Sequence, residues 1–134
     1  MATTYALRGC RHTCQMKVFL VEDSPILRER VQAILASIPG AETCGHAASA
    51  AGAIAAIEAA KPDVVVLDIQ LEQGSGFEVM RTIRASMPQV KFYVLTNFAN
   101  DGYRRKAESL GARGFFDKST EVERLRQALM QSSS

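Results

Sequence analysis

Short apolar runs of strand length alternate with longer segments whose apolar residues recur at helical spacing, five times over residues 16–134. The strongest strand signals are the continuous apolar runs at residues 18–21 and Val64–Leu67. Five such pairs predict an α/β fold, with a five-stranded, mainly parallel sheet and helices on both faces. Because parallel crossovers are right-handed, the predicted topology is the flavodoxin-like strand order 2-1-3-4-5.

Local signals set the limits of the other predicted elements. Ser24 and Pro25 form a favourable helix start, and Pro39 and Gly40 end that helix. Ser119 is predicted to cap the last helix, which should run to about residue 130. The other predicted strands are Ala41–Ala47, 92–95 and 113–116, and the other predicted helices are 49–60, Gly76–Ser86 and 101–110.

Length, charge and cysteine content exclude several classes of protein. The 134 residues fit one domain, and no apolar run approaches the ~18 residues of a membrane span. Residues 16–134 hold 14 basic and 14 acidic side chains, so the net charge of +2 comes from Arg8 and Arg11. This balance argues against direct nucleic-acid binding, which usually needs a basic excess. Three cysteines without a disulfide pattern indicate a reducing, cytoplasmic location.

The chain divides into a predicted N-terminal arm or start-site extension at residues 1–15, a domain at 16–131 and a tail at 132–134. The arm lacks the apolar stretch of a signal peptide. Cys10, His12 and Cys14 resemble metal ligands, but structural zinc normally needs four ligands and no second half follows. Free thiols are therefore the favoured interpretation of these cysteines.

Polar residues stand at the carboxyl ends of four predicted strands, where sheets of this kind bind ligands. Glu22 and Asp23 end the first strand, Asp68 the third and Thr96 the fourth, and Lys118 follows the fifth. Three adjacent carboxylates repel one another, and magnesium suits such a site because it binds carboxylates and water. One carboxylate can then attack phosphorus to give an acyl phosphate, while the cation and the lysine balance the phosphoryl charge.

Four segments of the sequence resemble the receiver domain of response regulators, from two-component signalling systems. They are VFLVEDSP, PDVVVLDIQL, YVLTN and GARGFFDKS, and the resemblance covers residues 16 to about 131. It implies that Asp68 is the phosphoacceptor and that Thr96 and Lys118 are the hydroxyl and the lysine of the phosphorylation site.

The resemblance also implies the metal ligands. Magnesium, for which manganese can substitute, would bind Asp23, Asp68 and the backbone carbonyl of Gln70, and Glu22 would act through a metal-bound water. The family pattern is not followed everywhere, because Asn97 stands where a smaller residue is usual and many members carry proline at position 119.

A switch between two conformations is implied as well. On phosphorylation Thr96 would move toward the phosphoryl group and Phe115 would turn into the vacated space. The face formed by helix 101–110, strand 113–116 and the last helix would then change shape. The alternative is that Phe115 and its neighbour merely alternate between core and surface.

The implied protein is a signalling phosphoacceptor and not an enzyme, apart from self-catalysed phosphorylation and dephosphorylation. Its partners would be a histidine kinase or histidine phosphotransfer protein and a downstream protein target. A homodimer through the face formed by helix 101–110, strand 113–116 and the last helix is another option, and no membrane contact is expected. We favour a stand-alone regulator, because no output domain follows the last helix; the alternative is a receiver excised from a longer DNA-binding regulator.

Two other classes of protein fit less well. A phosphohydrolase with an aspartyl-phosphate intermediate usually has a second Asp where Gln70 stands. A flavin-binding module needs a phosphate-binding loop after the first strand, and the acidic segment EDSPILR would repel a phosphate.

Overall fold

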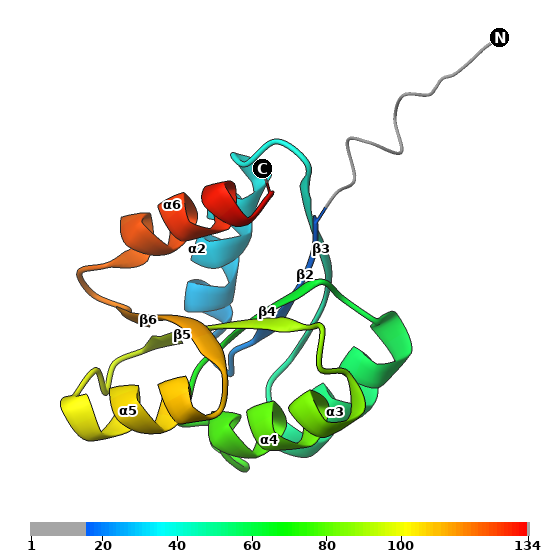
Figure 1. The fold of residues 1–134 in the computed structure, drawn as a ribbon. Coiled ribbons are helices and arrows are strands. Elements are labelled where there is room, and N and C mark those ends of the chain that lie inside the picture. Colours follow the sequence, from blue (N-terminus) through cyan, green and yellow to red (C-terminus); the bar gives the residue numbers. More distant parts are fainter. Residues whose placement is uncertain (1–15, 134) are drawn as a thin grey trace, which may run out of the picture.

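The computed structural model describes residues 16–133, which form one parallel sheet between two layers of helices (Figure 1). The strand order is β3-β2-β4-β5-β6, and all four neighbouring pairs are parallel. The predicted order 2-1-3-4-5 is therefore confirmed. The strands are β2 (Met16–Val21), β3 (Ala41–Ala47), β4 (Val64–Leu67), β5 (Lys91–Thr96) and β6 (Ala112–Asp117).

Helices cover both faces of the sheet, as predicted (Figure 1). One face carries α2 (Pro25–Ala36) and α6 (Val122–Ser133), and the other carries α3 (Ala50–Ala60), α4 (Gly76–Ser86) and α5 (Asp101–Ser109). None of these helices is both long and apolar enough to cross a membrane.

Two hydrophobic cores result, one on each face of the sheet. Because β4 lies inside a parallel sheet covered on both sides, all four of its residues are buried, each contributing about 1.5–3 kcal/mol. The buried helical side chains of the two cores are Val31, Leu35, Leu125 and Leu129 on the α2 and α6 face, and Ala50, Ala53, Ile57, Phe77, Val79, Met80, Ile83 and Ala107 on the other.

Short polar side chains start four of the five helices between residues 16 and 133. Ser24, Ser49, Ser75 and Asn100 each accept a hydrogen bond from a backbone N–H in the first turn of the helix that follows. Such caps satisfy amides that the helix leaves without a partner, and each is worth about 1 kcal/mol. The predicted cap at Ser24 is therefore confirmed.

The predicted cap at Ser119 is wrong. Both its N–H and its hydroxyl donate to the carboxylate of Asp117, which draws Ser119 into a turn before the helix. The helix α6 begins at Val122 and continues to Ser133, three residues beyond the predicted end. The candidate metal ligands of residues 1–15 lie outside the described residues.

Candidate functional site

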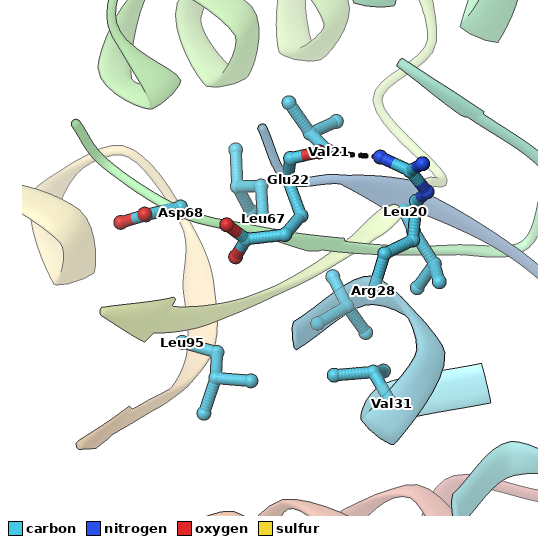
Figure 2. A pocket seen from close by; sticks show the side chains of 9 residues that line it. Leu20, Val21, Glu22, Arg28, Val31, Leu67, Asp68 and Leu95 are labelled. Atoms are coloured by element: carbon cyan, nitrogen blue, oxygen red, sulfur yellow. Dashed lines mark hydrogen bonds between the residues drawn. The ribbon is translucent and has the colours of Figure 1, made fainter. Parts of the chain in front are cut away.

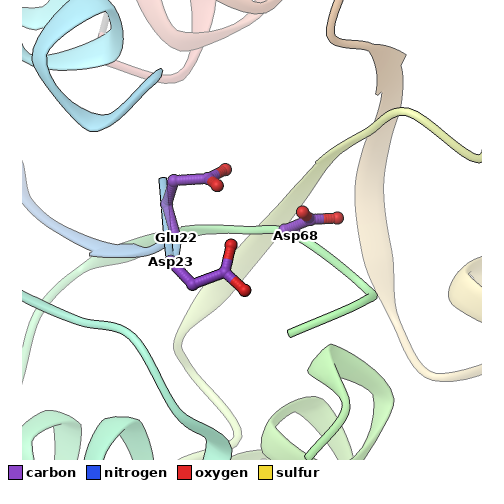
Figure 3. Close-up of side chains that lie close together, drawn as sticks. All are labelled: Glu22, Asp23 and Asp68. Atoms are coloured by element: carbon purple, nitrogen blue, oxygen red, sulfur yellow. The ribbon is translucent and has the colours of Figure 1, made fainter. Parts of the chain in front are cut away.

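The acidic residues at the ends of β2 and β4 lie side by side, because these two strands are neighbours in the sheet (Figure 3). Glu22, Asp23 and Asp68 each offer a carboxylate oxygen, and these oxygens lie within 4.8 Å of one another. Glu22 and Asp68 are buried and Asp23 is half-buried. The structure thus assembles the three carboxylates that the sequence placed at strand ends.

Lys118 brings a buried ammonium to the same group. Its Nζ lies 2.7 Å from Oδ2 of Asp68 and 2.9 Å from Oε1 of Glu22, and its exposed fraction is 4%. Three carboxylates and one ammonium leave a formal charge of −3 + 1 = −2. A single divalent cation would bring this charge to zero.

The pKa values of the buried groups show that the ammonium of Lys118 neutralises the carboxylates only in part. Burial raises the pKa of Glu22, and the hydrogen bond and charge of Lys118 offset the rise only in part. Burial on its own would lower the pKa of Lys118, but the hydrogen bonds and charges of Asp68 and Glu22 outweigh it and raise that pKa. The site therefore holds the lysine charged and still favours the uptake of further positive charge.

Backbone amides orient each carboxylate. The N–H of Ser24 donates to Oε2 of Glu22 over 3.0 Å, and the N–H of Glu72 donates to Oδ2 of Asp23 over 2.8 Å. The backbone of Gln70, predicted to supply a carbonyl to the metal, donates its N–H to Oδ1 of Asp68 over 3.3 Å. These amides could not be found from sequence, because any residue type offers the same backbone donor.

A glycine lets the loop after β4 fold tightly over the site. A Cβ on Gly76 would lie 2.2 Å from the carbonyl oxygen of Asp68, closer than non-bonded atoms approach. The N–H of Gly76 also donates to the carbonyl of Ile69 over 2.7 Å. The absence of a side chain at position 76 therefore allows α4 to begin directly against the backbone of Asp68.

Thr96 stands at the end of β5 and is fully buried. Its hydroxyl accepts a hydrogen bond from the N–H of Phe98 over 3.1 Å, and its carbonyl accepts one from the N–H of Lys118 over 3.0 Å. Thr96 at the end of β5 and Lys118 directly after β6 are thus held at the same edge of the sheet as the carboxylates.

Phe115 lies on β6 and has an exposed fraction of 5%. The guanidinium of Arg104 in α5 lies 4.8 Å from the centre of its ring and donates to its carbonyl over 3.3 Å. The neighbouring Phe116 packs into the opposite core. The ring of Phe115 is therefore buried under α5 in this structure.

Access to the carboxylates is from one side. A cleft of ≈ 440 Å³ opens over Asp23, Asp68 and Lys118, and Asn97 and the half-exposed Phe98 line it. Behind the carboxylates the walls are mostly apolar and leave a cavity of only ≈ 10 Å³, room for about one water (Figure 2). A ligand would therefore reach Asp68 through the open cleft.

A parallel sheet of this order, with acids, a hydroxyl and an ammonium at its carboxyl edge, defines the receiver class of signalling domains. A family model described as the response regulator receiver domain matches residues 18–130. The chain belongs to this family and is therefore a receiver domain of two-component signalling.

Named relatives support the same assignment. The chain is 35% identical over 114 residues to the DNA-binding transcriptional activator DevR/DosR of Mycobacterium tuberculosis, covering 85% of this chain and 52% of the relative. It is 29% identical over 116 residues to the response regulator GacA of Pseudomonas aeruginosa, covering 87% and 54%. The chain spans about half the length of these curated relatives.

Solved structures share the fold. A two-component response regulator of the LuxR family from Aurantimonas sp. SI85-9A1 matches with a TM-score of 0.82 and 30% identity, over 88% of this chain and 84% of that one. A DNA-binding response regulator of the LuxR family from Staphylococcus aureus matches with a TM-score of 0.80 over 89% and 99%, at 24% identity.

Proposed function

We propose that this receiver domain accepts a phosphoryl group on Asp68 from a histidine kinase or a histidine phosphotransfer protein. The observation that carries the proposal is the buried ammonium of Lys118, 2.7 Å from a carboxylate that two further acids surround. In the transfer, a carboxylate oxygen of Asp68 bonds to phosphorus as the bond from phosphorus to the histidine nitrogen breaks. Lys118 then balances charge on the transferred oxygens.

Magnesium fits the donor set, because it binds carboxylate oxygens and retains waters. Asp23 and Asp68 are the proposed direct ligands, with the backbone carbonyl of Gln70, and Glu22 acts through a water. Each carboxylate keeps acceptor capacity beyond the hydrogen bonds that it already receives. When bound, the cation supplies charge neutralisation for the phosphoryl oxygens; manganese would serve in the same way.

The proposed output runs through Thr96 and Phe115 to the face of α5, β6 and α6. In this proposal the Thr96 hydroxyl, which now accepts from an amide, turns to donate to a phosphoryl oxygen. A downstream protein, or a second copy of the chain, would read the change on that face. Two ion pairs lie at α6: Arg124 pairs with Glu121, which precedes the helix, and Arg126 pairs with Glu123 inside it.

Phosphorylation by acetyl phosphate with magnesium tests the proposal, with intact mass as the readout. The wild-type protein should gain one phosphoryl group, and Asp68→Asn should gain none. Asp63→Asn is the matched control, because Asp63 is an exposed acid at the opposite end of the same strand. Labelling that persists in Asp68→Asn, or multiple turnover of phosphate monoesters, would contradict the proposal.

A second candidate concerns the whole protein. The curated relatives are about twice as long, and one is named a DNA-binding transcriptional activator, which favours a receiver that belongs to a longer DNA-binding protein over a stand-alone regulator. Immunoblotting of source cells with an antibody against residues 16–133 separates the two. A band near 14.6 kDa supports the stand-alone regulator, and a band about twice that mass supports the longer one.

A further inference from the structure

Gln70 connects the phosphoacceptor to α5 through two hydrogen bonds. Its backbone N–H donates to Oδ1 of Asp68 over 3.3 Å, and its side-chain Nε2 donates to the hydroxyl of Tyr103 over 3.2 Å. Tyr103 lies 33 residues away along the chain, in the first turn of α5. One residue thus contacts the reacting carboxylate with its backbone and the output face with its side chain.

Two positions are open to the Gln70 carboxamide. Gln70 lines the cleft above Asp68, and it also lines a groove of ≈ 300 Å³ between the loop after β4 and α5. The side chain is exposed, so packing does not fix it in either place. In this structure the hydrogen bond to Tyr103 holds it on the α5 side.

Tyr103 is a well-anchored acceptor. Its ring packs against that of Phe77 with centroids 5.9 Å apart, and its N–H donates to the side chain of Asn100 over 2.8 Å. Phe77 is buried and carries the ammonium of Lys106 over its ring at 4.7 Å. The hydroxyl therefore stays in place while the carboxamide of Gln70 can move.

We propose that Tyr103 is a positioning residue that sets the lifetime of the acyl phosphate, by holding the Gln70 carboxamide out of the cleft. The inference rests on the proposed phosphorylation of Asp68. Released from Tyr103, the carboxamide can enter the cleft and orient a water for attack, the role that glutamine has in phosphoryl-transfer sites. Hydrolysis is then faster whenever the bond to Tyr103 is broken.

The reaction that Tyr103 restrains is the hydrolysis of the acyl phosphate. The oxygen of a water bonds to phosphorus, and the bond from phosphorus to the Asp68 oxygen breaks. Asp68 leaves as a carboxylate, and both hydrogens of the water leave on dihydrogen phosphate. The carboxamide only orients the water and is unchanged.

Decay of the phosphorylated protein after removal of the phosphoryl donor tests the inference. Tyr103→Phe keeps the ring contact and removes the hydroxyl, and the lifetime should shorten by about two- to tenfold, the population change expected for the loss of one hydrogen bond. Gln70→Asn should shorten the lifetime similarly without altering α5, because its carboxamide is too short to reach Tyr103. Gln70→Leu removes the carboxamide and should not shorten it.

The double variant Gln70→Leu with Tyr103→Phe is the decisive control, since it should decay no faster than Gln70→Leu alone. Faster decay of the double variant, or wild-type lifetimes in both Tyr103→Phe and Gln70→Asn, would overturn the inference and leave phosphorylation of Asp68 intact. If the wild-type protein itself forms no Asp68-dependent phosphoprotein, the proposed function fails and this inference fails with it.

Discussion

Replacing Lys118 by methionine removes the ammonium from a buried group of three acids and leaves a side chain of similar length. At 2.7 and 2.9 Å, each ion pair amounts to about 6 kcal/mol at an effective dielectric constant of 20. The cost of burying the ammonium offsets most of the sum, and removing one partner of a buried pair typically destabilises by about 3–5 kcal/mol. We expect a loss in this range at neutral pH without magnesium.

Protonation of one carboxyl limits the loss and gives it a definite pH dependence. Without Lys118 the folded-state pKa of Glu22 rises further above its unfolded value of about 4.3, so stability falls as pH rises. Substituting a proton for the ammonium costs about 1.36 kcal/mol for each pH unit above 4.3. The loss is then at most about 4.4 kcal/mol at pH 7.5 and about 1.6 kcal/mol at pH 5.5.

Urea unfolding followed by far-ultraviolet circular dichroism measures this difference, which suits a chain without tryptophan. Lys91→Met is the control, because Lys91 is half-buried at the opposite end of the sheet from the site. A loss for Lys118→Met below about 1 kcal/mol, or one that is equal at both pH values, would refute the argument that Lys118 balances the carboxylates.

Three further predictions concern the loop, the turn before α6 and the cation. Gly76→Ala should destabilise the fold by about 1–3 kcal/mol in urea unfolding, because its Cβ would meet the Asp68 carbonyl. Gly102→Ala is the control: a Cβ has room there in the helix, and the substitution should stabilise the fold by about 0.5–1 kcal/mol. Ser119→Ala should raise the pKa of Asp117, which hydrogen bonds from Ser119 now lower, in a carboxyl titration by NMR. Because the pKa of Asp117 is depressed in the fold, its contribution to stability is present above about pH 3.9 and is lost as pH falls below that value. An unchanged titration of Asp117 in Ser119→Ala would show that Ser119 does not lower this pKa. Magnesium at ten times its dissociation constant should stabilise the wild-type protein by about 1.4 kcal/mol and Asp68→Asn by much less; equal shifts would place the cation elsewhere.

The strand order was predictable because apolar pattern alone identifies buried parallel strands. The exact strand limits were not, since the backbone ladder continues past the apolar run. Lys91 and Thr96 pair with neighbouring strands although neither is apolar, and they extend β5 by one residue at each end beyond the prediction. Apolar character alone does not place a side chain in the core either, because Ile26, in the first turn of α2, is 73% exposed.

The candidate site was predictable to the extent that its side chains stand at strand ends. Topology then brings residues such as Asp23 and Asp68 together without further information. The contact between Lys118 and Glu22 was not foreseen, because the sequence indicates that both lie at the site but not which carboxylates the ammonium reaches. The bond from Gln70 to Tyr103 left no trace in the sequence, since neither residue type is unusual on a loop or helix surface.

Two proposed connections lead from Asp68 to α5, one through Thr96 and Phe115 and the other through Gln70 and Tyr103. They contact the helix at different residues. Arg104 rests on Phe115 of β6, and the preceding Tyr103 holds Gln70 of the loop after β4. A movement of α5 must therefore disturb the ring of Phe115 and the bond to Gln70 together, because the helix is one rigid element. Coupling between two sites is reciprocal in free energy, so a partner that binds the phosphorylated form more tightly favours phosphorylation by the same factor. A partner that displaces α5 would also break the bond from Tyr103 to Gln70 and so shorten the lifetime of the phosphoryl group. The output face would then act on the duration of the signal as well as transmit it.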